Sequence, residues 1–181
     1  MILLKKSDFF KEVVQKTGDN FMRCLHCKTC ASGCPVGDAM PNRPNGIIRL
    51  IQFGFKKEAL ESTDIWLCMG CNTCSTACPQ AIDIAAVMDA LREIAITEGV
   101  EIAEPKILDF HQAVLSSIQR YGRTHKLEIM LRYKLKQRDL FSDMDIGLRM
   151  LAKRKLDLLP SKIIQSESIR NLFNEFGAKM P

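Results

Sequence analysis

The sequence has no long apolar run, and this absence narrows the classes of protein that it can encode. No stretch approaches the ~20 apolar residues of a membrane-spanning helix, so we expect no membrane span. Before two lysines the first residues offer only Ile2 to Leu4, far short of the roughly 7 to 15 apolar residues of a secretion signal. We therefore expect a cytoplasmic protein, in a reducing compartment where closely spaced cysteines bind metal more often than they form disulfides.

Sequence motifs for independent catalysis are also missing. There is no GxGxxG dinucleotide fingerprint, no GxxxxGK[ST] phosphate loop and no GxSxG nucleophile elbow. The single tryptophan, Trp66, is better interpreted as a packing residue than as an electron relay. A chain without these motifs has no visible means to transform a substrate alone, so any catalysis would need a partner.

Eight cysteines are present, in two matching CxxCxxCxxxCP runs with an offset of 44 residues from Cys24 to Cys68. In two-cluster proteins with this spacing, three cysteines wrap around one [4Fe–4S] cluster and the fourth ligates the other cluster. We therefore predict two [4Fe–4S] clusters, one on Cys24, Cys27, Cys30 and Cys78, and one on Cys68, Cys71, Cys74 and Cys34. No cysteine is left for catalysis.

Other ligands and other metals fit the pattern less well. Zinc sites usually pair two CxxC units, so a third cysteine followed by x₃-C-P favours clusters, with zinc as a minor alternative. His26 lies inside the first run, but the complete cysteine set makes it a loop residue rather than a ligand, and His111 and His125 show no metal spacing. Structural clusters remain an alternative, although two crosswise clusters favour an electron path.

The pattern outside the runs predicts helices and no convincing strand. Ser7 is a candidate N-cap of a helix that reaches Thr17, and Asp83 of another that stops at Gly99. Between the runs, five apolar residues share one helical stripe: Ile47, Ile48, Leu50, Ile51 and Phe55. Later helices are predicted from Pro105 to Tyr121 and over roughly 124–137, 142–154 and 166–176. We predict an all-α fold, with an α-helical ferredoxin-like module over residues 1–100 whose cluster loops lie between helices, and a basic C-terminal helical extension over residues 101–181.

The extension carries the excess of positive charge. Residues 120–162 hold twelve Lys or Arg against five Asp or Glu. Only Tyr133 and Phe141 are available there to stack on bases and no nucleic-acid-reading motif occurs, so we expect no nucleic-acid partner and favour docking onto another protein. A nucleic-acid-binding protein with structural clusters is the less favoured alternative.

The two runs, with Asp64-Ile-Trp-Leu-Cys68 before the second and Pro-Gln-Ala-Ile-Asp-Ile after Cys78, resemble the α-helical ferredoxin family over about residues 20–98. Four downstream segments resemble more particularly the C-subunit family of heterodisulfide reductases from methanogenic archaea: Tyr121-Gly-Arg-Thr-His, Arg132-Tyr-Lys-Leu, Gly147-Leu-Arg-Met-Leu and Leu158-Leu-Pro.

The resemblance implies a non-catalytic electron-transfer subunit with two [4Fe–4S] clusters, whose ligands are the eight cysteines. Such subunits relay electrons from the flavin-containing A subunit to the catalytic B subunit, which reduces the CoM-S-S-CoB heterodisulfide in methanogenesis. A hydrogenase or a formate dehydrogenase is a candidate further partner. Alternatives are the iron–sulfur subunit of a related heterodisulfide-reductase-like or quinone-linked oxidoreductase, and a freely diffusing ferredoxin.

Overall fold

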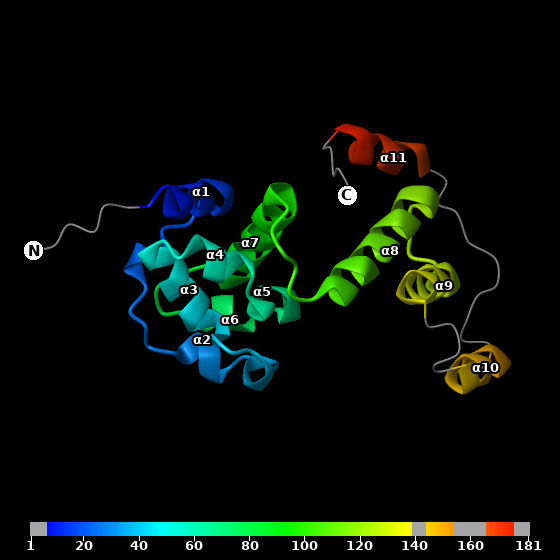
Figure 1. Ribbon diagram of the computed structural model, residues 1–181, viewed down its shortest axis with the longest axis horizontal. Helices are drawn as coiled ribbons and strands as arrows, with labels where there is room; N and C mark the ends of the chain where they lie inside the picture. Colours follow the sequence, from blue (N-terminus) through cyan, green and yellow to red (C-terminus); the bar gives the residue numbers. More distant parts are fainter. Residues whose placement is uncertain (1–6, 139–143, 154–165, 176–181) are drawn as a thin grey trace, which may run out of the picture. The chain divides into compact units, whose positions relative to one another are not determined.

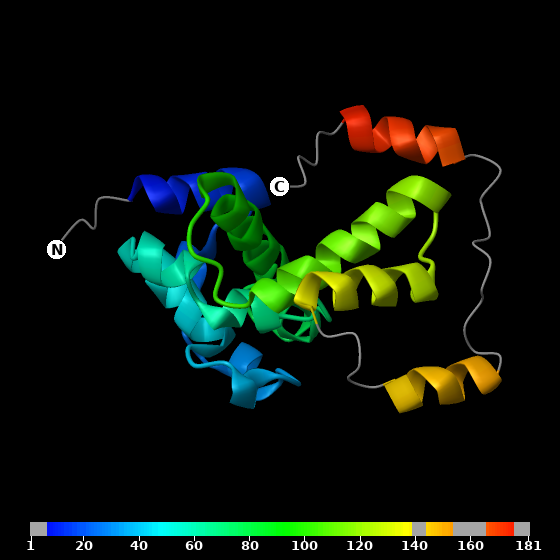
Figure 2. The same ribbon diagram turned by 45° about the vertical axis from the view of Figure 1, so that its right-hand side comes forward.

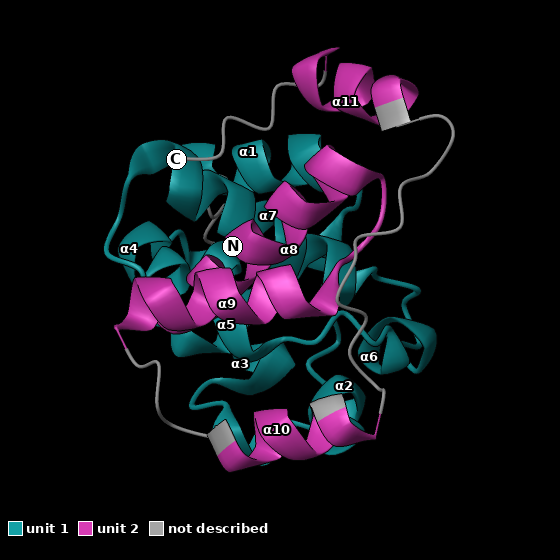
Figure 3. Cartoon of the chain, turned by 90° about the vertical axis from the view of Figure 1, so that its right-hand side faces the viewer, with its two compact units in different colours: residues 1–104 teal, residues 105–181 magenta. Residues whose placement is uncertain are grey.

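The computed structural model describes residues 7–138, 144–153 and 166–175. These residues form helices and turns without a β-strand, which confirms the predicted all-α fold (Figure 1). The chain divides into two compact units, Met1–Glu104 and Pro105–Pro181 (Figure 3). None of the described helices combines the length and the apolar character needed to cross a membrane.

In the first unit the described elements follow one another in the order α1 (Asp8–Thr17), η1 (Phe21–Arg23), α2 (Thr29–Ser32), η2 (Gly37–Ala39), α3 (Arg43–Phe53), α4 (Lys56–Leu60), α5 (Thr63–Leu67), α6 (Thr73–Thr76) and α7 (Ile84–Glu98). In the second unit they are α8 (Pro105–Tyr121), α9 (Lys126–Gln137), α10 (Met144–Ala152) and α11 (Ser166–Glu175). Lone turns of 3-10 helix are labelled η. The last two helices lie within the predicted ranges, whose outer ends fall partly outside the described residues.

Local sequence signals set the ends of α1 and α7, as predicted. The Ser7 hydroxyl accepts the backbone N–H of Phe10 at 3.1 Å, and the Asp83 carboxylate accepts that of Ala86 at 3.0 Å. Each bond satisfies an N–H group that has no partner within its helix. Helix α7 ends at Gly99, whose φ of 64° is a left-handed conformation that glycine adopts without strain.

The core of the first unit is built around α7, which packs against α1, α4, α5 and α6. Its buried face includes Ile84, Val87, Met88, Leu91 and Ala95, and α3 contributes Ile47, Ile48 and Ile51. The predicted stripe is wrong at its end, because Gly54 turns left-handed at φ 78° and stops α3. Phe55 is consequently half-exposed at the start of α4, and Leu50 is only partly buried.

A buried carboxylate joins α3 to α5 and so holds the segment that leads into the second cysteine run. Asp64 is fully buried and accepts hydrogen bonds from the backbone N–H groups of Asn42 at 2.9 Å and Arg43 at 2.7 Å. The Ser62 hydroxyl donates to it at 2.6 Å. Because buried charges require several such partners, this carboxylate fixes the start of α3 to α5.

In the second unit α8 and α9 lie side by side (Figure 2), and α11 contacts α8. The buried side chains among its described residues are few: Ala113, Ser117, His125 and Ile129. His125 caps α9, with its ring Nδ1 accepting the N–H of Glu128 at 3.3 Å. Several large apolar side chains of this unit are exposed, among them Phe110, Leu115, Leu131 and Leu135.

Candidate iron–sulfur sites

The two cysteine runs fold in the same way. In each run the first two cysteines lie in a loop, whereas the third lies on a one-turn helix, α2 or α6. The prediction that the runs are wholly loops is therefore wrong at Cys30 and Cys74, which are the buried members of the two runs. Both short helices begin after a residue in the left-handed region, Lys28 at φ 64° and Asn72 at φ 60°.

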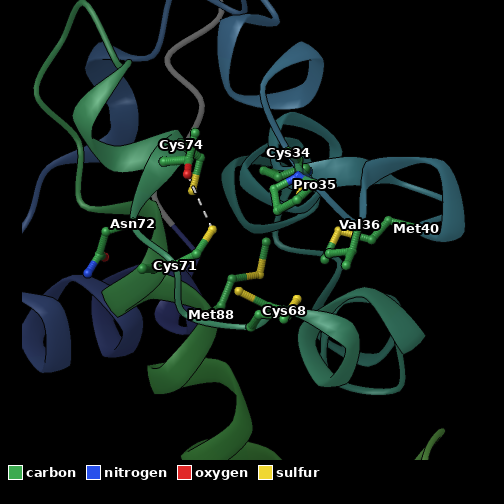
Figure 4. A pocket seen from close by; sticks show the side chains of 13 residues that line it. Cys34, Pro35, Val36, Met40, Cys68, Cys71, Asn72, Cys74 and Met88 are labelled. Atoms are coloured by element: carbon green, nitrogen blue, oxygen red, sulfur yellow. Dashed lines mark hydrogen bonds between the residues drawn. The ribbon is translucent and has the colours of Figure 1, made fainter.

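The cysteines gather in two cavities. The first cavity is partly open to solvent and contains Cys24, Cys27, Cys30 and Cys78. The second contains Cys34, Cys68, Cys71 and Cys74, which surround it in Figure 4. In each cavity the fourth cysteine comes from the other run, which is the crosswise grouping that the spacing predicts. Ligation of a cluster by each group stays a prediction.

Apolar side chains complete both cavities. Pro35, Val36, Met40 and Met88 line the second cavity beside its cysteines. The first cavity is lined by Ile48, Pro79, Ile82 and Ile84. Such a lining limits the access of water, which strengthens the electrostatic effect of each nearby charge and hydrogen bond.

The two cavities are neighbours. The short helices α2 and α6 pack against each other, and a side chain at Gly33 would lie 3.8 Å from the methyl carbon of Thr73. The negative charge of Cys74, in the second cavity, contributes to the raised pKa of Cys30, in the first. A group bound in one cavity would therefore lie close to a group bound in the other.

The thiols within each cavity differ in acidity. Thr29 Oγ1 lies 3.3 Å from Cys27 Sγ, and Thr73 Oγ1 lies 3.4 Å from Cys71 Sγ. These hydroxyls can donate to a thiolate sulfur and so lower the pKa of both exposed thiols. Burial, together with the charge of Cys24, raises the pKa of Cys30 to about 11. Metal binding must therefore release a proton from a thiol that holds it firmly.

The guanidinium group of Arg92 contacts the backbone carbonyl of Cys68, a cysteine of the second cavity. Burial raises the pKa of the Cys68 thiol, and a backbone hydrogen bond from Gly70 and the positive charge of Arg92 oppose this effect. Arg92 donates hydrogen bonds to the backbone carbonyls of Ile65 and Cys68, and forms an ion pair with Asp89 at 2.9 Å. Neither Arg92 nor the buried Asp64 was identified from the sequence, because their roles depend on tertiary contacts without a characteristic spacing.

The histidines and the tryptophan lie where non-ligand residues are expected. His26 lines the first cavity, but its Nε2 donates to the side-chain oxygen of Gln52 at 2.8 Å. Gln52 in turn donates to the backbone carbonyl of Phe21 at 2.9 Å. Trp66 is buried in the core and lines neither cavity, in agreement with a packing role.

The residues present fit an iron–sulfur cluster in each cavity. Four cysteine side chains converge from two segments on an apolar space, which is the donor set that a [4Fe–4S] cluster requires. Comparison with known proteins agrees, because residues 23–83 match the family described as a 4Fe-4S dicluster domain. Residues 23–83 are therefore similar to iron–sulfur domains, and they lie within an all-α, ferredoxin-like fold.

Three curated relatives are similar to this chain, and all three are C subunits of heterodisulfide reductases. The chain is 34% identical over 76 residues to the iron–sulfur C subunit of the CoB–CoM heterodisulfide reductase of Methanopyrus kandleri, which is 42% of this chain and 40% of the relative. It is 31% identical over 106 residues, 56% of this chain and 63% of the relative, to the C subunit of the ferredoxin/F420H2-dependent CoB–CoM heterodisulfide reductase of Methanosarcina acetivorans.

The third relative is the C subunit of the ferredoxin:CoB–CoM heterodisulfide reductase of Methanosarcina mazei, 33% identical over 97 residues, which is 51% of this chain and 57% of the relative. The chain thus spans about half the length of the curated relatives that it matches. Its similarity to the C subunit of heterodisulfide reductases, predicted from the sequence, is confirmed.

Proposed function

We propose that this chain is the electron-transfer subunit of a heterodisulfide reductase complex in the cytoplasm. It relays electrons through two [4Fe–4S] clusters from the flavin-containing A subunit to the catalytic B subunit, which reduces the CoM-S-S-CoB heterodisulfide. The observation that carries this proposal is the convergence of all eight cysteines into two neighbouring cavities. When bound, a [4Fe–4S] cluster supplies reversible one-electron transfer.

The side chains of the first unit have three tasks in such a relay. The cysteines hold the clusters, and the packing of α2 against α6 keeps the two groups adjacent. The apolar lining limits water, so that fixed charges and dipoles determine the electrostatic environment. Thr29 and Thr73 place a hydroxyl beside the exposed cysteine of each cavity, where it can stabilise the thiolate.

The disulfide chemistry belongs to the B subunit under this proposal, because every cysteine of this chain is assigned to a cluster. Residues 101–181 would dock the chain onto its partner subunits. A hydrogenase or a formate dehydrogenase is the candidate source of electrons further upstream. The names of the three relatives support the choice of complex.

Serine substitutions test the crosswise assignment of ligands. The protein purified without oxygen should contain about eight iron and eight sulfide per chain. Cys78→Ser and Cys24→Ser should change the electron paramagnetic resonance signal of the same cluster, and Cys34→Ser and Cys68→Ser that of the other. Zinc in place of iron, or a signal shared by Cys34→Ser and Cys24→Ser, would contradict the assignment.

A pull-down without oxygen from the source cells tests the complex. The recovered material should include a flavoprotein and a cysteine-rich subunit, and it should reduce the CoM-S-S-CoB disulfide with a reduced viologen as donor. Recovery with a quinone-linked enzyme instead would assign the clusters to another pathway.

A further inference from the structure

The two cysteine loops share a backbone conformation but differ in the side chains that they carry. His26 and Gly70 occupy equivalent positions in the two runs, with φ 52° and φ 61°, and Lys28 and Asn72 do so with φ 64° and φ 60°. The second loop therefore has glycine and asparagine where the chain turns left-handed. The first loop has two bulkier side chains at the same places.

Lysine is an unfavourable choice for such a position. Left-handed backbone is adopted readily by glycine, and asparagine and histidine occur there more often than other residues. Lysine is not among the residues that favour left-handed backbone, and the Lys28 side chain makes no hydrogen bond that caps α2. Strained positions near a binding site commonly carry a side chain needed for function. The ammonium group of Lys28 is the property that Asn72 lacks.

Lys28 is also the only Lys, Arg, Asp or Glu among the described residues that line the two cavities. It is exposed and forms no ion pair within the described part of the chain. The nearby Arg23 is different, because Asp19 pairs with it at 2.7 Å. The first cavity thus opens beside an unpaired positive charge, whereas the second opens among neutral residues.

An exposed apolar residue follows the first cysteine of each run. Leu25 is 64% exposed beside the first cavity, and Met69 is 71% exposed beside the second. Cys27, the exposed cysteine of the first cavity, lies between Leu25 and Lys28 in the sequence. We call Leu25, Cys27 and Lys28 the first opening. An apolar centre with a polar, charged rim is the usual composition of a protein interface.

We propose that the first opening is the docking site of an electron-transfer protein that presents carboxylates around its own redox centre. Lys28 attracts the carboxylates, Leu25 forms the apolar contact, and the electron passes at the exposed Cys27. The second opening, around Met69 and Asn72, has no charged side chain and does not select partners by their charge. This docking site rests on the proposed electron-transfer function, since it names the kind of partner that exchanges electrons with the first cluster.

Charge complementarity of this kind acts mainly on the rate of encounter. A positive group at the point of electron entry raises the association rate of anionic partners and lowers that of cationic ones. The effect weakens with ionic strength, because the Debye length falls to about 3 Å at 1 M salt. Two small redox probes of opposite charge can therefore measure the site without knowledge of the natural partner.

The test uses the full chain with its clusters under anaerobic conditions. Stopped-flow absorbance would give the rate of cluster reduction by methyl viologen, a cation, and by a sulfonated propyl viologen, an anion in its reduced form. A change in cluster potential alters the rates with both probes, so its effect cancels in the ratio of the anionic to the cationic rate. Lys28→Asn, which copies the residue of the second loop, should lower this ratio about threefold at low salt, and the loss should vanish near 1 M salt.

Two variants serve as controls. Lys28→Arg retains the charge and should retain the ratio of the unsubstituted chain, while Asn72→Lys adds a charge at the second opening and should raise the ratio. An unchanged ratio in Lys28→Asn at low salt, with both probes reducing the clusters, would overturn the docking site and leave the electron-transfer function standing. Clusters that neither probe reduces would overturn both.

Discussion

At the scale of single residues, the environment of the second cavity depends on a side chain that does not line it. Arg92 is 15% exposed, whereas its ion-pair partner Asp89 is 66% exposed. Solvent screens an exposed charge more strongly than a buried one, so the positive charge of Arg92 should dominate near Cys68. A positive charge stabilises the reduced, more negative state of a nearby cluster.

Arg92→Met should lower the reduction potential of the cluster that Cys68→Ser also changes. We expect a decrease on the order of 50 mV, which corresponds to about a sevenfold change in the equilibrium constant for one electron. Arg92→Lys should recover most of the potential, and Asp89→Asn should raise it. Potentiometric titration followed by electron paramagnetic resonance would measure the shift, and equal shifts in both clusters would contradict a local effect.

At the scale of elements, the attachment of α3 to α5 depends on Asp64. Asp64→Ala should lower the free energy of unfolding by about 3 kcal/mol, because it leaves buried N–H groups without a partner. Asp8→Ala, which removes an exposed ion pair with Lys11, should cause no measurable loss. Thermal unfolding without oxygen would compare the two variants, and similar melting temperatures would contradict the role of Asp64.

The same scale shows what the sequence could predict. The caps at Ser7 and Asp83 and the stop at Gly99 were predictable, because each depends on residues within one helical turn. Phe55 was predicted to lie on the apolar stripe because it is apolar and has the right spacing. This prediction is wrong, because α3 ends at Gly54, one residue earlier. The crosswise cysteine groups followed from spacing alone, since the motif itself specifies how the ligands are shared.

Other features could not be predicted from local patterns. The short helices around Cys30 and Cys74 follow left-handed residues, and Lys28 gives no sequence signal for that conformation. Arg92 is far from Cys68 in the chain and resembles any surface arginine of an amphipathic helix. Contacts between distant segments determine such roles, so they appear only in the folded structure.

At the scale of the whole molecule, the second unit is built differently from the first. Its described helices bury few large side chains of their own, while Leu131 and Leu135 are 55% and 54% exposed one helical turn apart on α9. Large exposed apolar side chains in a repeated position indicate a surface that is covered in an assembly. The docking role of residues 101–181 stays a prediction, and these two exposed leucines offer a way to test it.

Leu131→Glu combined with Leu135→Glu should therefore weaken the association with the partner subunits at least tenfold, without loss of iron. Phe53→Glu is a matched control in the first unit, since Phe53 is 49% exposed. Co-purification with the flavoprotein and the catalytic partner, together with iron analysis of each variant, would measure both properties. Retention of the partners by the double variant would contradict docking through α9.

The exchange of fourth cysteines bears on how such a protein could originate. Cys34 lies in the second cavity and Cys78 in the first, so neither copy of the repeat completes a cavity by itself. A single-copy ancestor would have offered three cysteines to its own site and a fourth to a neighbour. Two identical ancestral chains facing each other would have completed both sites at once. Joining two such copies in one chain would turn a symmetric, ligand-swapped homodimer into a single polypeptide, in which equivalent positions such as 28 and 72 can carry different residues.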